Sequence, residues 1–193
     1  IVALGGGSTI DAAKAAAVLN TYSPAEVMEI LGASVSEADS IEPYFGTGLV
    51  SKMKETTGRA VIPVIGVQTA ASSGAHLTKY SNITDPVTGQ KKLIVDEAIV
   101  PPASVFDFKI TLDSPISLTL DGGLDGIAHA WEVFMGTSGP AYEKVKEVAE
   151  LSIRLIVYGL QKIKKDKRGL EGRTALGLGT DLGGYSIREK LPR

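Results

Sequence analysis

Asp125 and His129 lie four residues apart and form the pair of side chains best suited to metal chemistry in this sequence. They fall within residues 122–132, an apolar and glycine-containing stretch that is typical of a helix. On a helix, residues four apart lie on the same face, so both side chains can reach one metal ion from one side. The same spacing also suits a carboxylate that orients a structural histidine, and the pair alone leaves both interpretations open.

Composition indicates an ordinary globular protein, because 44% of the 193 residues are hydrophobic and 22% are charged. The net charge is −2 and the chain has no long basic run, so nothing favours a nucleic acid or a membrane as partner. The absence of cysteine excludes disulfides and leaves nitrogen and oxygen ligands for any metal. With no signal peptide and no apolar run of membrane-spanning length, we expect a cytoplasmic protein.

The chain begins directly in an apolar run, residues 1–4, that is typical of a buried strand. Because a doubly wound domain rarely begins in a central strand, we expect this sequence to be an internal part of a longer chain. A glycine turn, Gly5-Gly6-Gly7-Ser8, then joins this strand to a helix predicted over residues 11–19. Glycines let the backbone approach a bulky anion, and the free N–H groups at a helix start point towards it. Phosphate binding and a plain strand–helix turn are both open interpretations of this segment.

Two charged residues lie in the first turns of that helix. Asp11 is near the positive end of the helix dipole, where a carboxylate stabilises the helix even without a ligand. Lys14 follows one turn later and is interpreted as a solvated helix residue.

Residues 60–67 form a second apolar run, which predicts a parallel strand buried on both faces. This strand leads into residues 68–76, a run of small and hydroxyl side chains. Loops at the carboxyl ends of strands are where doubly wound sheets bind ligands, and hydroxyls can bond phosphate or ribose. A serine-rich turn without a ligand is the simpler interpretation of the loop taken alone. His76 is interpreted as an ordinary polar loop residue.

The remaining elements predict an α/β region that is followed by helices only. Residues 1–113 are expected to form an α/β domain with a parallel sheet, and residues 114–193 the start of a helical domain. Residues 32–58 are expected to be a loop with at most one helical turn, in which Glu37, Asp39 and Glu42 form a solvated rim. The other predicted elements are a helix at 24–31, a turn at 85–89, strands at 78–83, 91–95 and 103–107, and helices at 122–135, 141–160 and 171–185.

Four separated motifs, which follow one another along the chain as they do in the family, resemble the iron-containing alcohol dehydrogenase family, whose fold is shared with dehydroquinate synthase. Residues 5–14 resemble its GGGSxxDxAK element, and residues 123–132 its GLDAxxHAxE element. Lys91, ten residues before Pro101, matches the family's lysine ahead of an LxP turn. Residues 69–78 take the place of the TTAGTGSExT loop. There Thr69, Gly74 and Thr78 agree, Ser73 replaces threonine, and His76 stands where the family usually has glutamate.

The resemblance implies hydride transfer between an alcohol, aldehyde or ketone and NAD or NADP, with a divalent metal, Fe²⁺ or Zn²⁺. It implies that residues 1–113 are part of a Rossmann-like, dinucleotide-binding domain and residues 114–193 the start of a helical, metal-binding domain. It also implies an interdomain cleft for the substrate and a homo-oligomer, a dimer or larger. The metal ligands it implies are Asp125 and His129. The cofactor-binding residues it implies are Gly5, Gly6, Gly7, Ser8, Asp11, Thr69, Ser73 and Lys91.

Two departures from the family pattern keep other functions open. The family completes its metal site with two later histidines, and this sequence has no histidine after His129. A site with two protein ligands is weak, so we expect the 193 residues alone to be inactive. The alternatives are a maleylacetate-reductase-like enzyme or a polyol or glycerol-phosphate dehydrogenase on the same fold. A further alternative is a non-catalytic remnant that binds a nucleotide.

Overall fold

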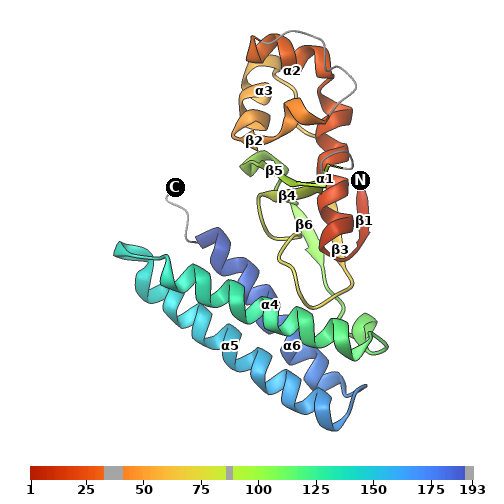
Figure 1. Cartoon of the computed structure of the whole chain (residues 1–193), viewed down its shortest axis with the longest axis vertical. Helices are drawn as coiled ribbons and strands as arrows, with labels where there is room; N and C mark the ends of the chain where they lie inside the picture. The colour runs from red at the N-terminus through yellow and green to blue at the C-terminus, as the bar shows by residue number, and fades with distance from the viewer. Residues whose placement is uncertain (33–40, 86–88, 190–193) are drawn as a thin grey trace.

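A computed structural model describes residues 1–32, 41–85 and 89–189, and shows an α/β region joined to three long helices (Figure 1). The central sheet has the strand order β1-β3-β6 and consists of β1 (Val2–Gly5), β3 (Ile65–Gln68) and β6 (Ala103–Val105). All its pairings are parallel, with Val2 opposite Ile65 and Ile65 opposite Ala103. The prediction of a Rossmann-like parallel-sheet region followed by helices is confirmed.

Helix α1 (Gly7–Thr21) follows β1 and covers the sheet. Its residues Ile10 and Ala17 form one buried cluster with Ala3 of β1, Val64 and Ala75. The helix begins four residues before the predicted start at residue 11, because Gly6 has the extended conformation of an N-cap residue and the helix starts directly at Gly7. The second half of the glycine turn, Gly7 and Ser8, is therefore already part of the helix.

A second three-stranded sheet lies beside α1 and belongs to a lobe that extends to the top of Figure 1. Its order is β2-β5-β4, from β2 (Gly46–Thr47), β5 (Lys91–Val95) and β4 (Tyr80–Thr84). Helices α2 (Pro24–Leu31) and α3 (Leu49–Thr57) and the 3-10 turns η2 (Glu42–Tyr44) and η3 (Glu97–Ile99) complete the lobe. Its apolar core joins α1 to these elements through Val18, Tyr22, Val50, Met53 and Ile94.

The 3-10 turn η4 (Phe108–Thr111) leads into the helical region, α4 (Ile116–Met135), η5 (Gly139–Ala141), α5 (Tyr142–Lys165) and α6 (Leu170–Glu189). Glycines bring α5 and α6 together, because a Cβ at Gly159 would lie 2.8 Å from the Gly172 carbonyl oxygen. A Cβ at Gly179 would likewise lie 3.0 Å from the Ser152 carbonyl oxygen. Within the described ranges no helix has the length and apolar character that crossing a membrane requires.

The strand predicted over residues 60–67 was wrong at its first half, because β3 begins only at Ile65. The preceding backbone bonds elsewhere: the Ile62 amide donates to Thr21 Oγ1 at 3.2 Å. The Pro63 carbonyl still accepts from the nitrogen of Ile1, the residue before β1, at 2.8 Å. Proline has no N–H to donate, so regular strand pairing does not continue before Pro63.

The loop predicted over residues 32–58 was also wrong for its second half, which contains η2, β2 and the nine-residue helix α3. The N-cap of α3 is Gly48, which has no side chain to cap the helix. Asp96 does so instead, because its carboxylate accepts from the Ser51 amide at 2.8 Å. Glu42 forms an ion pair with Lys92, whereas Glu37, Asp39 and residues 86–88 of the predicted turn lie outside the described residues.

The predicted helix over residues 122–135 begins earlier, at Ile116, with Pro115 as its N-cap residue. Gly122 and Gly123, taken as the start, lie within the helix and are buried against other elements. Packing rather than propensity therefore explains why these glycines lie inside the helix, since interior glycine costs a helix about 1 kcal/mol relative to alanine.

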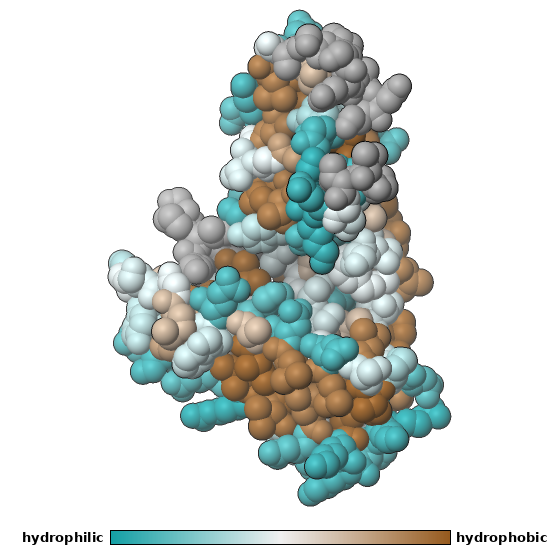
Figure 2. Space-filling view, in the orientation of Figure 1, coloured by the Kyte–Doolittle hydropathy of each residue, from teal (hydrophilic) through white to brown (hydrophobic). Residues whose placement is uncertain are grey.

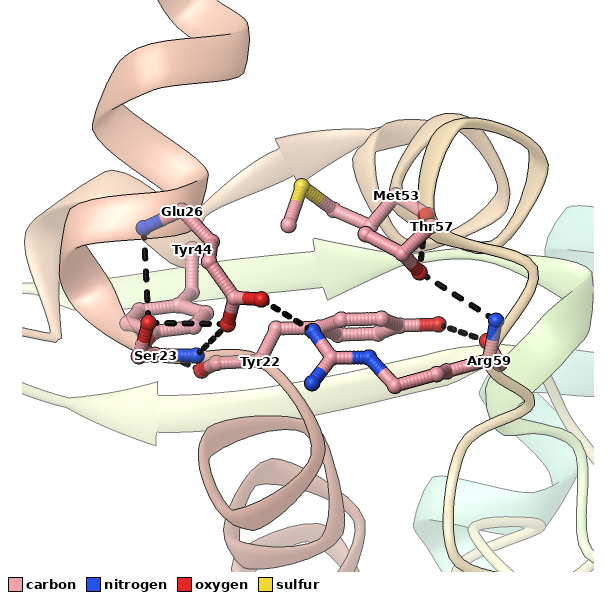
Figure 3. Close-up of polar contacts among 7 residues, drawn as sticks. All are labelled: Tyr22, Ser23, Glu26, Tyr44, Met53, Thr57 and Arg59. Atoms are coloured by element: carbon pink, nitrogen blue, oxygen red, sulfur yellow. Dashed lines mark hydrogen bonds and ion pairs between the residues drawn. The ribbon is translucent and has the colours of Figure 1, made fainter.

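Two buried tyrosines join the end of α1 to the lobe (Figure 3). Tyr44 Oη donates to the Tyr22 carbonyl at 2.8 Å, and Tyr22 Oη donates to the Arg59 carbonyl at 2.6 Å. The Arg59 guanidinium pairs with Glu26, whose carboxylate also belongs to the capping box of α2 with Ser23. Burial raises the pKa of Tyr44 to about 12.

We expect Tyr44→Phe to cost about 1 kcal/mol of stability at pH 7, the usual value of one such hydrogen bond. The unfolded chain loses the Tyr44 proton near its ordinary pKa of 10.0, whereas the folded chain keeps it until about pH 12. The folded state then binds more protons, so Tyr44 stabilises fully below pH 10 and this contribution falls between pH 10 and 12. Urea unfolding at pH 7 and 10.5, with the exposed Tyr142→Phe as control, measures this. An equal cost of Tyr44→Phe at both pH values would contradict it.

Candidate functional site

A cleft of about 860 Å³ lies where α1, the loop after β3, the β4–β5 hairpin and α4 meet. Seven of the predicted site residues line it, and three lie just behind its wall. The lining residues are Gly7, Ser8, Asp11, Ser73, Lys91, Asp125 and His129. The residues behind are Gly5, Gly6 and Thr69, and the Thr69 amide donates to the Gly5 carbonyl at 3.2 Å. Residues far apart in the sequence therefore share one cavity, of a size usual for small-molecule sites.

The first turn of α1 opens into this cleft. The Thr9 and Ile10 amides donate to the Gly6 carbonyl at 3.1 and 3.2 Å, so the amides of Gly7 and Ser8 precede the first helical hydrogen bonds. A Cβ at Gly7 would overlap Ser73 Oγ, which means that the Ser73 side chain packs directly on the backbone of the first turn of α1. Free amides at a helix N-terminus and an exposed serine together suit a phosphate group.

Asp11 is buried and ties α1 to β4 rather than standing free at the helix start. Its Oδ2 accepts from the Asn82 amide at 3.1 Å, and its carbonyl accepts from Ser81 Oγ at 2.8 Å. Burial raises the pKa of Asp11, opposed by the hydrogen bond from Asn82 and by the charge of Lys14. Asp11 Oδ1 has no partner among the described atoms.

Lys14 was wrongly interpreted as solvated, because its side chain is completely buried. Its Nζ donates to the carbonyls of Ala75, Thr78 and Tyr80 at 2.5, 2.7 and 2.8 Å. Burial lowers the pKa of Lys14 to about 8, so the ammonium form still predominates at pH 7. Three carbonyls take all three N–H groups of that ammonium. The position on α1 gave no signal of this role, since the acceptors lie 61 to 66 residues away.

The loop of residues 69–78, which we call the hydroxyl loop, is held by glycines on three helices. Besides the contact of Gly7 with Ser73, a Cβ at Gly122 of α4 would overlap the Ala71 carbonyl oxygen. On α6, a Cβ at Gly184 would lie 2.8 Å from Gly74 Cα. The backbone of the loop therefore lies directly on α4 and α6, while its Ser73 side chain lies on the backbone of α1.

His76 was also misjudged as an ordinary polar loop residue, because only 2% of it is exposed. Its Nε2 lies 3.3 Å from Oδ1 of Asp181 on α6, and its ring meets Phe106 edge-on. The contact joins the α/β region to the helical region.

The β4–β5 hairpin supplies cleft residues that sequence reasoning missed, among them Tyr80, Asn82 and Thr84. They have no phosphate- or metal-binding spacing, so only the pairing of β4 with β5 brings them to the cleft. Lys91 at the start of β5 is exposed and lines the same wall, where its ammonium can reach a bound ligand.

Asp125 and His129 face the cleft from α4, and their side chains are 51% and 36% exposed. Asp125 Oδ1 and His129 Nε2 are 3.7 Å apart. Two ligands of one tetrahedral ion lie about 3.4 Å apart, given metal–ligand distances of about 2.1 Å. The pair thus fits half of a metal shell. Among the described residues, no group of three histidine, cysteine or acidic side chains could hold a metal ion.

Comparisons with known proteins identify relatives of this chain by sequence and by fold. The family model for iron-containing alcohol dehydrogenases matches residues 1–108. The NAD-dependent methanol dehydrogenase of Bacillus methanolicus is 27% identical over 187 residues, 97% of this chain and 43% of that protein. An alcohol dehydrogenase from Oenococcus oeni superposes with a TM-score of 0.76 at 25% identity, covering 98% of this chain and 43% of that one. Sulfoacetaldehyde reductase from Bifidobacterium kashiwanohense, solved with NAD⁺, gives 0.72 at 26% identity, covering 96% and 43%.

A parallel-sheet, Rossmann-like region followed by helices is the class of fold that the chain shares with these solved structures. Within that class the chain belongs to the iron-containing alcohol dehydrogenase family. It spans less than half the length of the relatives described above.

We expect Lys14→Met to destabilise the chain by about 3 kcal/mol, because it removes the donor of three carbonyls, in the hydroxyl loop and β4, at nearly constant side-chain volume. Lys52→Met is the matched control, since the exposed Lys52 reaches only the Ile30 carbonyl at 3.4 Å. That control should stay within about 0.5 kcal/mol of the parent chain in urea unfolding. Equal effects of the two substitutions would show that the buried ammonium contributes nothing.

Proposed function

We propose that this chain carries the cofactor-binding part and two metal ligands of an oxidoreductase that transfers a hydride between an alcohol, aldehyde or ketone and NAD(P). The observation that carries the proposal is the single cleft lined by the α1 N-terminus, the hydroxyl loop and the Asp125–His129 pair. Membership in the iron-containing alcohol dehydrogenase family supports the same reaction. One relative is named an NAD-dependent methanol dehydrogenase and another was solved with NAD⁺, which supports NAD as the cofactor to test first.

In this proposal the cofactor pyrophosphate lies at the start of α1. The free amides of Gly7 and Ser8 donate to its oxygens, and the exposed Ser8 hydroxyl adds a further donor. Ser73, which touches Gly7, closes the cradle from the hydroxyl loop. Gly5, Gly6 and Thr69 keep the backbone behind it compact, and Lys91 reaches the ribose from β5.

The opposite wall of the cleft holds the reacting end of the substrate. Asp125 and His129 would hold a divalent ion, Fe²⁺ or Zn²⁺, that polarises the substrate oxygen. The oxygen and nitrogen donors of this pair suit either ion. Asp11 and Asn82 fix the β4 side of the cleft through their hydrogen bonds. The hydroxyl loop, held on α4 and α6, limits the water that reaches the space between the two walls.

One observation favours a second candidate function, nucleotide binding without catalysis, for these 193 residues alone. The described part of the chain offers only two ligands at the metal position, whereas the phosphate cradle needs no further residues. Other reductases and polyol dehydrogenases on this fold use the same cofactor cradle and remain alternatives for the substrate.

The charge of the cradle gives a direct test of cofactor binding. We expect Ser8→Asp to weaken NADH binding about tenfold, about 1.4 kcal/mol, because the new carboxylate repels the pyrophosphate. The substitution should leave the fold intact, because acidic residues suit a helix N-terminus. Ser8→Asn is the isosteric neutral control and should keep the affinity within about threefold. NADH fluorescence titration at two salt concentrations measures the difference, which should shrink at high salt. Unchanged affinity for Ser8→Asp would refute the assigned cradle.

The metal role of α4 has its own test in the full encoded protein loaded with Fe²⁺ or Zn²⁺. We expect His129→Ala to lower alcohol oxidation about a hundredfold or more and to reduce the bound metal, while NADH affinity stays unchanged. Glu150→Gln on the exposed face of α5 is the control. Turnover and metal content equal to those of the parent protein would remove His129 from the ligand set.

A further inference from the structure

The hydroxyl loop and α6 meet at a polar pair that the family resemblance does not account for. His76 Nε2 lies 3.3 Å from Asp181 Oδ1, with the histidine almost fully buried and the aspartate 26% exposed. His76 comes from the loop between β3 and β4, and Asp181 comes from the middle of α6. The contact therefore spans the α/β region and the helical region.

A backbone contact lies directly beside this pair. A Cβ at Gly74 would lie 2.6 Å from Gly184 Cα, so neither glycine has room for a side chain. Gly184 follows Asp181 by three residues on the same face of α6. Gly74 precedes His76 by two residues. The glycine contact and the polar pair thus form one patch that sets how the loop lies on α6.

We infer that His76 and Asp181 are a positioning pair that fixes the hydroxyl loop on α6. The pair thereby holds Ser73 in the lining of the cleft that Asp125 and His129 also line. The consequence for cofactor affinity rests on the proposed function, because it requires that Ser73 faces the dinucleotide. The placement of the loop does not rest on it.

The charges around His76 explain why a histidine suits this position. Asp181 faces its Nε2, while Lys14 bonds the carbonyl of the preceding residue, Ala75, and Asp11 lies one turn before Lys14. A glutamate, the family's usual residue at this position, would bring a second carboxylate against Asp181 in a buried place. Like charges so placed repel strongly, whereas an imidazole N–H can be donated to the carboxylate. The residue types at positions 76 and 181 are therefore coupled.

Four forms of the chain test this coupling: the parent, His76→Glu, Asp181→Asn, and the double variant. We expect His76→Glu to speed amide hydrogen exchange of residues 73–78 at least tenfold and Asp181→Asn about threefold. The double variant should return to within threefold of the parent, because an amide can donate to the introduced carboxylate. NADH dissociation constants should follow the same order, with the double variant again near the parent.

Glu150→Gln is the matched control, since it neutralises a carboxylate in an exposed pair, 3.8 Å from Arg154 on α5. It should change neither measurement. A merely structural role would raise exchange alike in α1, α4 and α6, so the proposal requires the change to concentrate in residues 73–78. Exchange is measured without ligand, so a parent chain that binds no NADH counts against the proposed function alone. Unchanged exchange in both single variants, or a double variant as fast as His76→Glu, would overturn the positioning pair.

Discussion

The direct contact of the hydroxyl loop with three helices is the constraint on which the rest of the structure depends. Gly7 of α1, Gly122 of α4 and Gly184 of α6 each meet the loop where a Cβ would collide. These glycines let irregular backbone pack as closely as a well-packed interior demands. They also explain why α4 keeps glycine within its length despite the cost in helix propensity. The cleft exists because the loop is pressed against all three helices at once.

Close packing of an irregular loop leaves its carbonyls away from water, and buried carbonyls need donors. Lys14 donates from α1 to two loop carbonyls, those of Ala75 and Thr78, and to the Tyr80 carbonyl of β4, which is why a charged side chain is completely buried in this fold. A buried ammonium is costly by itself and becomes acceptable when every N–H has an acceptor. Asp11 does the complementary task one turn earlier by accepting from β4. Helix α1, whose first turn opens towards the cleft, thus binds the hydroxyl loop through Lys14 and β4 through Asp11.

Local patterns allowed prediction of the positions of β1, α2 and β5 and of the change to helices, because each depends on nearby residues. The predicted burial of β1 and β3 on both faces was wrong, because Val2, Leu4 and Ile65 are 68%, 63% and 40% exposed in this structure. Elements that depend on distant partners could not be predicted from the sequence. Helix α3 is capped by Asp96, 45 residues from Ser51, and nothing within residues 49–57 indicates that cap. The burial of Lys14 and His76 depends on acceptors in other elements, whereas both residue types usually lie at surfaces. In the site, motif spacing located Ser8, Ser73 and Asp125, but the hairpin residues reach the cleft only through strand pairing.

The two walls of the cleft differ in how much each requires from outside the described residues. The proposed phosphate cradle is formed by the start of α1 and by the hydroxyl loop, which contact each other directly. The proposed metal side consists of two half-exposed side chains on one helix, and such a pair binds an ion weakly until further ligands join it. In the proposed function, cofactor affinity therefore depends on how the hydroxyl loop packs on α1 and α6, while ion binding depends on ligands beyond Asp125 and His129. The hydroxyl loop contacts α4 through Gly122, one turn before Asp125, so a movement of α4 reaches the hydroxyl loop directly.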